Sequence, residues 1–193
     1  PADFISEALD QTRGWFYTLV VIGAALFDKP PFRNVVVNGL VLAADGKKMS
    51  KRLKNYPSPS EIMDTYGADA LRLTLLSSPV VRAEDLRFSE EAVREIMRTI
   101  ILPVWNAYSF LVTYARVDEW VPDDARGAAP PSDPDNVLDR WILSQLEGAV
   151  DDIEEAMDAY ELQRAAVRFT DLIEKLTNWY IRRSRRRFWK SRN

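Results

Sequence analysis

Apolar residues recur at three- and four-residue spacing along three long segments in the second half of the chain. This spacing places them on one face of a helix, and such a face is normally buried against other helices. The first segment follows Ser89, and the other two run over 138–160 and 162–180. Three long helices joined by turns predict an antiparallel helical bundle.

The first of these helices is the clearest in the chain. Ser89 is its expected N-cap, and its apolar stripe from Val93 to Ala115 keeps helical period over about seven turns. We expect this stripe, which includes Trp105 and Tyr108, to be bundle core. Pro103 lies inside the helix and predicts a kink, because proline removes a backbone hydrogen bond.

The second bundle helix is preceded by a proline-rich, acidic stretch, 121–135, which predicts a loop between helices. The helix itself carries a dense set of acidic residues. Paired carboxylates can bind metal, but acids on the polar face of a helix are usually solvated, so we expect no metal site. The residues concerned are Asp151, Asp152, Glu154, Glu155 and Asp158.

The first half of the chain predicts a small α/β part. A helical apolar pattern begins near Thr12, for which Asp10 and Thr12 are the candidate N-caps, and Pro30-Pro31 ends it. The apolar run 35–43 predicts a buried strand, or two short strands hinged near Asn38-Gly39. Ligands of such units bind beyond the carboxyl ends of the strands. The predicted fold is therefore mainly α with a small α/β part.

A strongly basic loop, 45–52, follows that apolar run and holds four basic residues in six positions. Asp45-Gly46 is a turn dipeptide. Lysines on a loop at a strand exit suit a polyphosphate, because each is a point charge on a flexible stem. A solvated basic loop with no ligand is the alternative that the loop alone leaves open.

Further along, Ser58, Pro59 and Glu61 predict a capping box at the start of a short helix that ends at Gly67. A second helix is expected over 68–76 and a short strand over 85–88.

The net charge of −3 hides an uneven distribution. The stretch 182–192 holds seven basic residues and no acidic one, which leaves a net of −10 on the rest of the chain. The chain contains neither Cys nor His, so disulfides, thiolate or histidine metal sites and Ser-His or Cys-His nucleophile pairs are excluded within it. No apolar run approaches the ~20 residues that span a membrane.

An arginine-rich segment continues the last helix, with aromatic residues interleaved. Arginine pairs with phosphate in a bidentate manner and stacks on bases, and aromatic rings stack on bases too, so RNA is the expected ligand. The alternative is structural, because basic side chains stabilise helix C-termini and can pair with the acidic face of the preceding helix. The arginines are Arg182, Arg183, Arg185, Arg186 and Arg187, and the aromatic residues are Trp179, Tyr180, Phe188 and Trp189.

Three motifs in this order resemble the class I aminoacyl-tRNA synthetases. Lys48-Met49-Ser50-Lys51 has the form of their KMSK loop. The stretch 10–16, DQTRGWF, looks like a segment of the isoleucyl-tRNA synthetase family, and 178–189 resembles a helix of that family's anticodon-binding domain. The resemblance covers essentially the whole chain. Arg52 replaces the second Ser of the motif, and Ala8 stands where Gly is expected.

The resemblance implies a set of functional residues. Lys48 and Lys51 would be catalytic and, with Ser50, would bind ATP. Glu7, Asp10 and Gln11 would contact the aminoacyl-adenylate. The five arginines and Trp179 would bind tRNA. ATP would be a substrate, Mg²⁺ would accompany it in the full-length enzyme, and no metal ligand is expected in this chain.

The resemblance also implies an organisation. Residues 1–57 would be the C-terminal part of a Rossmann-like catalytic domain, 58–88 a connecting element, and 89–193 part of a helical anticodon-binding domain. The chain would be a piece of a cytoplasmic enzyme that activates isoleucine with ATP and transfers it to tRNA(Ile), with no membrane partner. The family's HIGH motif would lie outside it, so the piece alone is expected to be inactive. A valyl or leucyl enzyme, or a non-catalytic RNA-binding helical module, are the alternatives.

Overall fold

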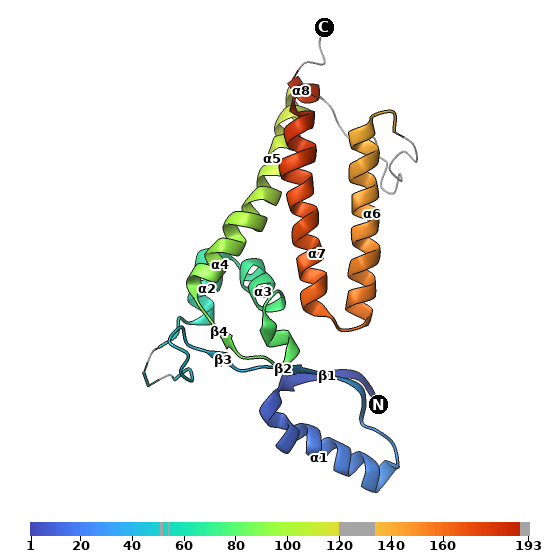
Figure 1. The fold of residues 1–193 in the computed structure, drawn as a ribbon. Helices are drawn as coiled ribbons and strands as arrows, with labels where there is room; N and C mark the ends of the chain where they lie inside the picture. Colours follow the sequence, from blue (N-terminus) through green and yellow to red (C-terminus); the bar gives the residue numbers. More distant parts are fainter. Residues whose placement is uncertain (51, 54, 120–133, 190–193) are drawn as a thin grey trace. The chain divides into compact units, whose positions relative to one another are not determined.

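The computed structural model describes residues 1–50, 52, 53, 55–119 and 134–189 (Figure 1). The chain is mainly helical, and its contacts divide it into two compact units. Unit 1 comprises Pro1–Arg94 with Tyr160–Gln163, and unit 2 comprises Glu95–Ala159 with Arg164–Asn193. Most of the predicted proline-rich loop 121–135 lies outside the described residues.

Unit 1 begins with a strand, a helical crossover and a second strand that is parallel to the first (Figure 1). Their register pairs Ala2 with Phe32 and Ala8 with Asn38. The crossover ends at Asp28, whose φ of 47° is left-handed, just before Pro30-Pro31. The elements are β1 (Ala2–Ala8), the 3-10 turn η1 (Leu9–Arg13), α1 (Trp15–Ile22), the π-helical turn η2 (Gly23–Phe27) and β2 (Phe32–Asn38).

The apolar run 35–43 forms two short strands, as the hinged alternative predicted, and not one buried strand. β2 ends at Asn38, and β3 (Val41–Leu42) follows. Gly39 lies between them, where a Cβ would clash with the carbonyl oxygen of Glu84. The prediction of burial is wrong for β2, because Val35 is 41% exposed in a sheet of only two strands.

β3 pairs in parallel with β4 (Leu86–Arg87), and the helices that follow the basic loop lie between these two strands in the sequence. The capping box at Ser58 and Glu61 is confirmed, and Gly67 ends its helix at φ 87°. Phe16, Ile62, Val80 and Phe88 are buried in this unit. The intervening elements are α2 (Pro59–Tyr66), α3 (Ala68–Leu76) and the 3-10 turn η3 (Pro79–Arg82).

Unit 2 contains the long helices (Figure 1). Ser89 caps the first, accepting a hydrogen bond from the Ala92 amide at 3.3 Å. A π-helical turn lies just before Pro103, so the helix changes its hydrogen bonding there and does not end; the kink at Pro103 stays a prediction. The segments are α4 (Glu90–Ile96, which begins in unit 1), η4 (Met97–Ile101), α5 (Leu102–Val117), α6 (Val137–Asp158), α7 (Leu162–Glu174), the π-helical turn η5 (Lys175–Ile181) and α8 (Arg182–Trp189).

The predicted core stripe of the first long helix is only partly buried. Ile100 is 1% exposed, but Trp105 and Tyr108 are 60% and 58% exposed. The face of α5 that meets α8 is instead the one bearing Phe110, whose ring centroid lies 5.0 Å from that of Phe188. The apolar stripe is wider than the surface that the other helices of this unit cover.

Within the described residues, the continuous helical stretch Glu90–Val117 is long and apolar enough to cross a membrane by length and composition. Core helices of soluble proteins meet the same criteria, so the expectation of no membrane partner remains a prediction.

Candidate functional site

The basic loop of unit 1 begins as a tight hairpin. Lys48 forms an antiparallel bridge with Leu42, and the Ala43 amide donates to the Lys47 carbonyl at 2.9 Å. Gly46 closes the turn with a φ of 79°, which favours glycine. The strand exit therefore fixes the backbone of the loop as far as Lys48.

Asp45 stabilises the turn through both carboxylate oxygens. Its Oδ1 accepts from the Lys47 amide at 3.0 Å, and its Oδ2 lies 3.4 Å from Lys47 Nζ. Two contacts with Lys47 lower the pKa of the Asp45 carboxyl: the hydrogen bond from the Lys47 amide has the larger effect, and the Lys47 side chain adds to it. Lys47 thus has an acidic partner inside the loop.

Asn55 holds the second half of the loop. Its side-chain Oδ1 accepts from the Ser50 amide at 2.9 Å, and its Nδ2 donates to the Lys48 carbonyl at 3.2 Å. A backbone bond from Leu53 to Ser50, at 3.1 Å, closes a turn between them. Of the three predicted ATP-binding residues, Lys48 and Ser50 lie here, and Lys51 is outside the described residues.

The sequence reasoning missed Asn55. The sequence carried no pattern that pointed to it, because both of its partners are backbone atoms, although a side chain that both donates and accepts can bridge the two ends of a turn.

The predicted adenylate residues lie at the carboxyl end of β1. Glu7 is the penultimate residue of that strand, and Asp10 and Gln11 are in η1 directly after it. Glu7 and Asp10 are exposed. Asn38, at the end of β2, donates to Ser6 Oγ at 3.2 Å, so the carboxyl ends of the two parallel strands meet at this edge.

The two N-cap candidates predicted for α1, Asp10 and Thr12, are both wrong. The N-cap of α1 is Gly14, and Gln11 Oε1 accepts a hydrogen bond from the Trp15 amide at 3.0 Å. Thr12 donates instead to the Leu9 carbonyl at 2.8 Å. The cause is the 3-10 turn, which delays the start of α1 to Trp15. The amide NH₂ of Gln11 and one lone pair of its Oε1 therefore remain for a ligand.

The arginine block of unit 2 is the helix α8, which continues α7 and η5 without a break, as predicted. Arg187 makes a bidentate pair with Asp139 of α6, at 2.6 and 2.7 Å. Tyr180 donates to the same carboxylate at 2.9 Å. This interaction confirms that at least one arginine pairs with the preceding acidic helix.

The pKa values around Asp139 follow from these contacts. The Arg187 guanidinium, helped by the Tyr180 hydroxyl, lowers the pKa of the Asp139 carboxyl. Hydrogen bonding to Asp139 raises the pKa of Arg187. Burial, and then the neighbouring carboxylate, raise the pKa of Tyr180. The three groups favour the charged pair and the neutral phenol at neutral pH.

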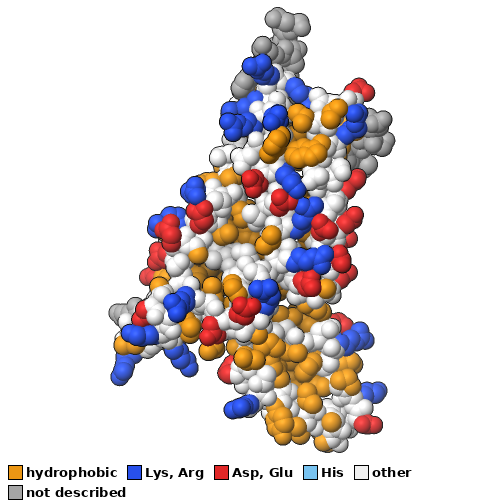
Figure 2. Space-filling view, in the orientation of Figure 1, with side chains coloured by type: hydrophobic (Ala, Val, Ile, Leu, Met, Phe, Trp, Pro, Cys, Tyr) orange, Lys and Arg blue, Asp and Glu red, His pale blue; other side chains and the backbone are white. Residues whose placement is uncertain are grey.

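The other predicted RNA-binding residues are arranged differently from Arg187. Arg183 lies over the Trp179 ring at 4.2 Å, and Arg185 lies 6.0 Å from the Phe110 ring. Arg182 and Arg186 are exposed, and no ion pair among the described residues includes them. Figure 2 shows Lys and Arg side chains gathered around α8.

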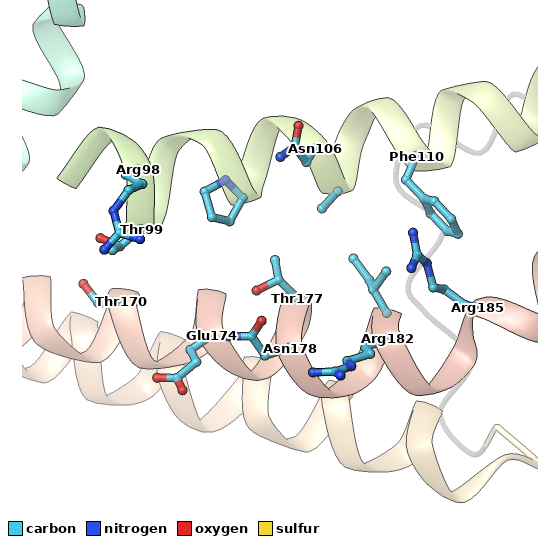
Figure 3. A pocket seen from close by; sticks show the side chains of 13 residues that line it. Arg98, Thr99, Asn106, Phe110, Thr170, Glu174, Thr177, Asn178, Arg182 and Arg185 are labelled. Atoms are coloured by element: carbon cyan, nitrogen blue, oxygen red, sulfur yellow. The ribbon is translucent and has the colours of Figure 1, made fainter. Parts of the chain in front are cut away.

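A cavity of 870 Å³ runs between the η4–α5 helix and the α7–η5–α8 helix of unit 2. Figure 3 shows Arg185 directed toward Phe110 across it. Arg98 and Arg182 also line the cavity, and Glu174 is the acidic residue in its wall. Its mixed polar and apolar lining suits a polar, partly anionic chain better than a compact apolar ligand.

The residues that the structure describes contain no group of three or more acidic, histidine or cysteine side chains suited to a metal ion. Two of the five acids named in α6 pair with α7 and are not simply solvated: Asp152 pairs with Arg168 at 2.6 Å, and Glu155 pairs with Arg164 at 2.9 Å.

Comparisons with known proteins match both units. A family model of class I tRNA synthetases (I, L, M and V) matches residues 1–87, and a model of the anticodon-binding domain of tRNA ligase matches residues 139–193. One solved structure, the ternary complex of Agrobacterium radiobacter K84 agnB2 LeuRS-tRNA-LeuAMS, has a TM-score of 0.71 at 20% identity. It covers 94% of this chain and 23% of that one. The fold is thus that of a class I synthetase segment.

Sequence relatives specify the group within that class. The isoleucine--tRNA ligase of Protochlamydia amoebophila is 56% identical over 189 residues, and that of Chlamydia muridarum is 59% identical over 191 residues. The matches cover 98% and 99% of this chain but 18% of each relative. The chain belongs to the isoleucine--tRNA ligase family. The valyl and leucyl alternatives are not favoured.

Proposed function

We propose that the protein containing this chain activates isoleucine with ATP and transfers it to tRNA(Ile). The observation that carries the proposal is the identity of 56% with an isoleucine--tRNA ligase over 98% of the chain. The basic loop at the exit of β3 supports it, because the loop presents lysines beyond a strand end, where a nucleotide is expected.

In the activation step, a carboxylate oxygen of isoleucine attacks the α-phosphorus of ATP, and the bond to the bridging oxygen of pyrophosphate breaks. Negative charge shifts onto pyrophosphate, so fixed positive groups near it lower the barrier. We assign this role to Lys48 and Lys51, with the Ser50 hydroxyl as a hydrogen-bond donor to phosphate. Lys47 is the weaker candidate because Asp45 is its partner.

Glu7, Asp10 and the Gln11 amide would then hold the isoleucyl-adenylate. Carboxylates suit the substrate ammonium group or a ribose hydroxyl, and an amide NH₂ suits an acceptor atom. The exposure of Glu7 and Asp10 at the carboxyl end of β1 supports this role. Mg²⁺ would enter with the phosphates of ATP, because the described residues offer no ligand cluster of their own.

The arginine helix would contact tRNA. Arg182 and Arg186 are the best candidates for phosphate contacts, and Trp179, 51% exposed with Arg183 stacked on it, offers a surface for a base. Arg185 lines the cavity beside them. Arg187 is the weakest candidate of the five, because Asp139 neutralises its charge and accepts from both of its terminal nitrogens.

The finer organisation belongs to the same proposal. Residues 1–57 form the end of a Rossmann-like catalytic domain, 58–88 a connecting element, and 89–193 part of an antiparallel anticodon-binding bundle. We further propose a cytoplasmic location, where tRNA is charged for protein synthesis.

The test is ATP–pyrophosphate exchange by the full-length protein with isoleucine, valine and leucine in competition. Exchange that depends on isoleucine, followed by charging of tRNA(Ile), is expected. Preference for valine or leucine, or tRNA binding without exchange, would refute the proposal in favour of one of the alternatives. The chain by itself is expected to show no exchange, because it spans 18% of its relatives.

A further inference from the structure

The basic loop is held by two kinds of contact. Up to Lys48, backbone pairing holds the loop, through the bridge to Leu42 and the bond from Ala43 to Lys47, and the Asp45 carboxylate adds a hydrogen bond from the Lys47 amide. Beyond Lys48, the side chain of Asn55 makes two contacts, to the Ser50 amide at 2.9 Å and the Lys48 carbonyl at 3.2 Å.

These two contacts require an amide side chain. One backbone donor and one backbone acceptor face Asn55, and a carboxamide of this length can satisfy both at once. An aspartate could accept from Ser50 but could not donate to the Lys48 carbonyl. An alanine could do neither. The residue type at 55 is therefore matched to the two groups that it bridges.

The contacts have a direct consequence for Lys48. Its backbone is bound on one side by the Leu42 bridge and on the other by Asn55, so the direction in which its side chain leaves the loop is set. The peptide group at Ser50 is set in the same way. Groups that are aligned before the reaction stabilise developing charge without a reorganisation cost.

We infer that Asn55 is a positioning residue for ATP activation, which holds Lys48 and Ser50 in the geometry that meets the phosphates. The inference rests on the proposed function of the loop. Asn55 acts through the loop backbone, so its loss should weaken the activation step, which releases pyrophosphate, and spare the transfer to tRNA, which does not.

The experiment compares wild-type full-length protein with Asn55→Ala. In ATP–pyrophosphate exchange, kcat/KM for ATP is expected to fall roughly tenfold to a hundredfold, the range for two lost hydrogen bonds. The KM for isoleucine, the transfer of isoleucine from preformed adenylate to tRNA, and the Tm are expected to be unchanged. Equal losses in activation and transfer, or a lowered Tm, would overturn the positioning role in favour of a general structural one.

Two further variants sharpen the result. Asn55→Asp keeps the acceptor and loses the donor, so it is also expected to lose activation; wild-type exchange in either Asn55 variant would overturn the inference. Asn34→Ala is the control, since Asn34 is exposed in β2 and its amide donates to Asp3 O at 3.0 Å. Wild-type protein measured in parallel separates the two proposals. If the wild type shows no isoleucine-dependent exchange, the proposed function itself is refuted. If the wild type shows exchange and Asn55→Ala is equally active, only the role of Asn55 is refuted.

Discussion

The basic loop and the arginine helix both concentrate positive charge, but they order it in opposite ways. In the loop, short polar side chains such as Asp45 and Asn55 fix the backbone, and lysine side chains extend from it; Lys47 is 76% exposed. In α8, the helix fixes its own backbone, and two of the arginine side chains are ordered by partners, one on α6 and one on the preceding turn η5. Arg187 lies against Asp139, and Arg183 lies over Trp179.

This difference suits two different tasks. A lysine on a fixed backbone and a flexible stem can follow charge that moves during a reaction. An arginine that is already ordered, such as Arg183 over Trp179, loses less conformational freedom when it binds a large anionic surface. Two segments with similar basic composition therefore present positive charge differently: the loop presents it on flexible lysine stems, and the helix presents it in part on ordered guanidinium groups.

The largest expected effect lies in the loop. In the full-length protein, Lys51→Ala and Lys48→Ala should each lower kcat for isoleucine activation about a hundredfold or more, as for other groups that stabilise developing charge. Lys47→Ala is the matched control and should change kcat less than about tenfold, because Lys47 is partnered by Asp45. Pyrophosphate exchange measures all three. An unchanged kcat in Lys51→Ala would remove that residue from the mechanism.

A smaller effect is expected for the arginine helix. Replacing Arg182 and Arg186 by Ala should weaken tRNA binding and reduce the slope of log K against log salt by about 1.4–1.8, the value for two phosphate contacts. Arg187→Ala should change the slope less. Arg72→Ala, at an exposed arginine paired with Asp69, is the control. Titrations at several salt concentrations with no change in slope for the double variant would exclude these contacts.

The Asp139–Arg187 pair should affect stability and its pH dependence. Asp139→Asn is expected to lower the free energy of unfolding at pH 7 by about 1–2 kcal/mol, less than for a buried pair because Arg187 is half exposed. The folded-state pKa of Asp139 is lowered, so its contribution is present above the unfolded-state value of about 3.9 and is lost as the pH falls through the folded-state pKa.

Urea unfolding of the chain at a series of pH values measures this contribution. The difference between wild type and Asp139→Asn should be constant from pH 5 to pH 8 and should shrink below about pH 4. A difference that grows on acidification would contradict the assignment.

The smallest effect concerns the capping box of α2. Ser58→Ala should cost about 1 kcal/mol of stability, because it leaves the Glu61 amide without its side-chain acceptor. Ser60→Ala, in the first turn of the same helix, should be nearly neutral. Equal losses in the two variants would show that the serine hydroxyl at the cap contributes nothing specific.

Sequence patterns predicted most of the features that depend on neighbouring residues, with the N-cap of α1 as the exception. The capping box at Ser58, the stop at Gly67 and the cap at Ser89 are all local hydrogen-bonding motifs, and all are confirmed. The continuous helix from α7 to α8 was also predictable, because no proline or glycine interrupts it. The family resemblance came from motifs of the same local kind.

Features that depend on distant residues were not predictable. The exposure of Trp105 was missed, because a helical stripe does not reveal how much of it other helices cover. The Asp139–Arg187 pair joins residues far apart in the chain, so the sequence showed only that an acidic helix preceded the arginines. Asn55 was missed for another reason: its bonds are to backbone atoms, which carry no residue signature.

The pairing of β3 with β4, next to the close approach of Gly39 to the Glu84 backbone, has a consequence for the order of folding. β3, which carries the basic loop, depends on partners much later in the chain: the Leu40 amide donates to Asp85, 45 residues away, and Val41 and Leu42 pair with Leu86 and Arg87. Closing so long a loop is slow compared with forming a helix. During synthesis the loop therefore leaves the ribosome before the strand that anchors it, and β3 acquires its pairing with β4 only after Phe88 has emerged.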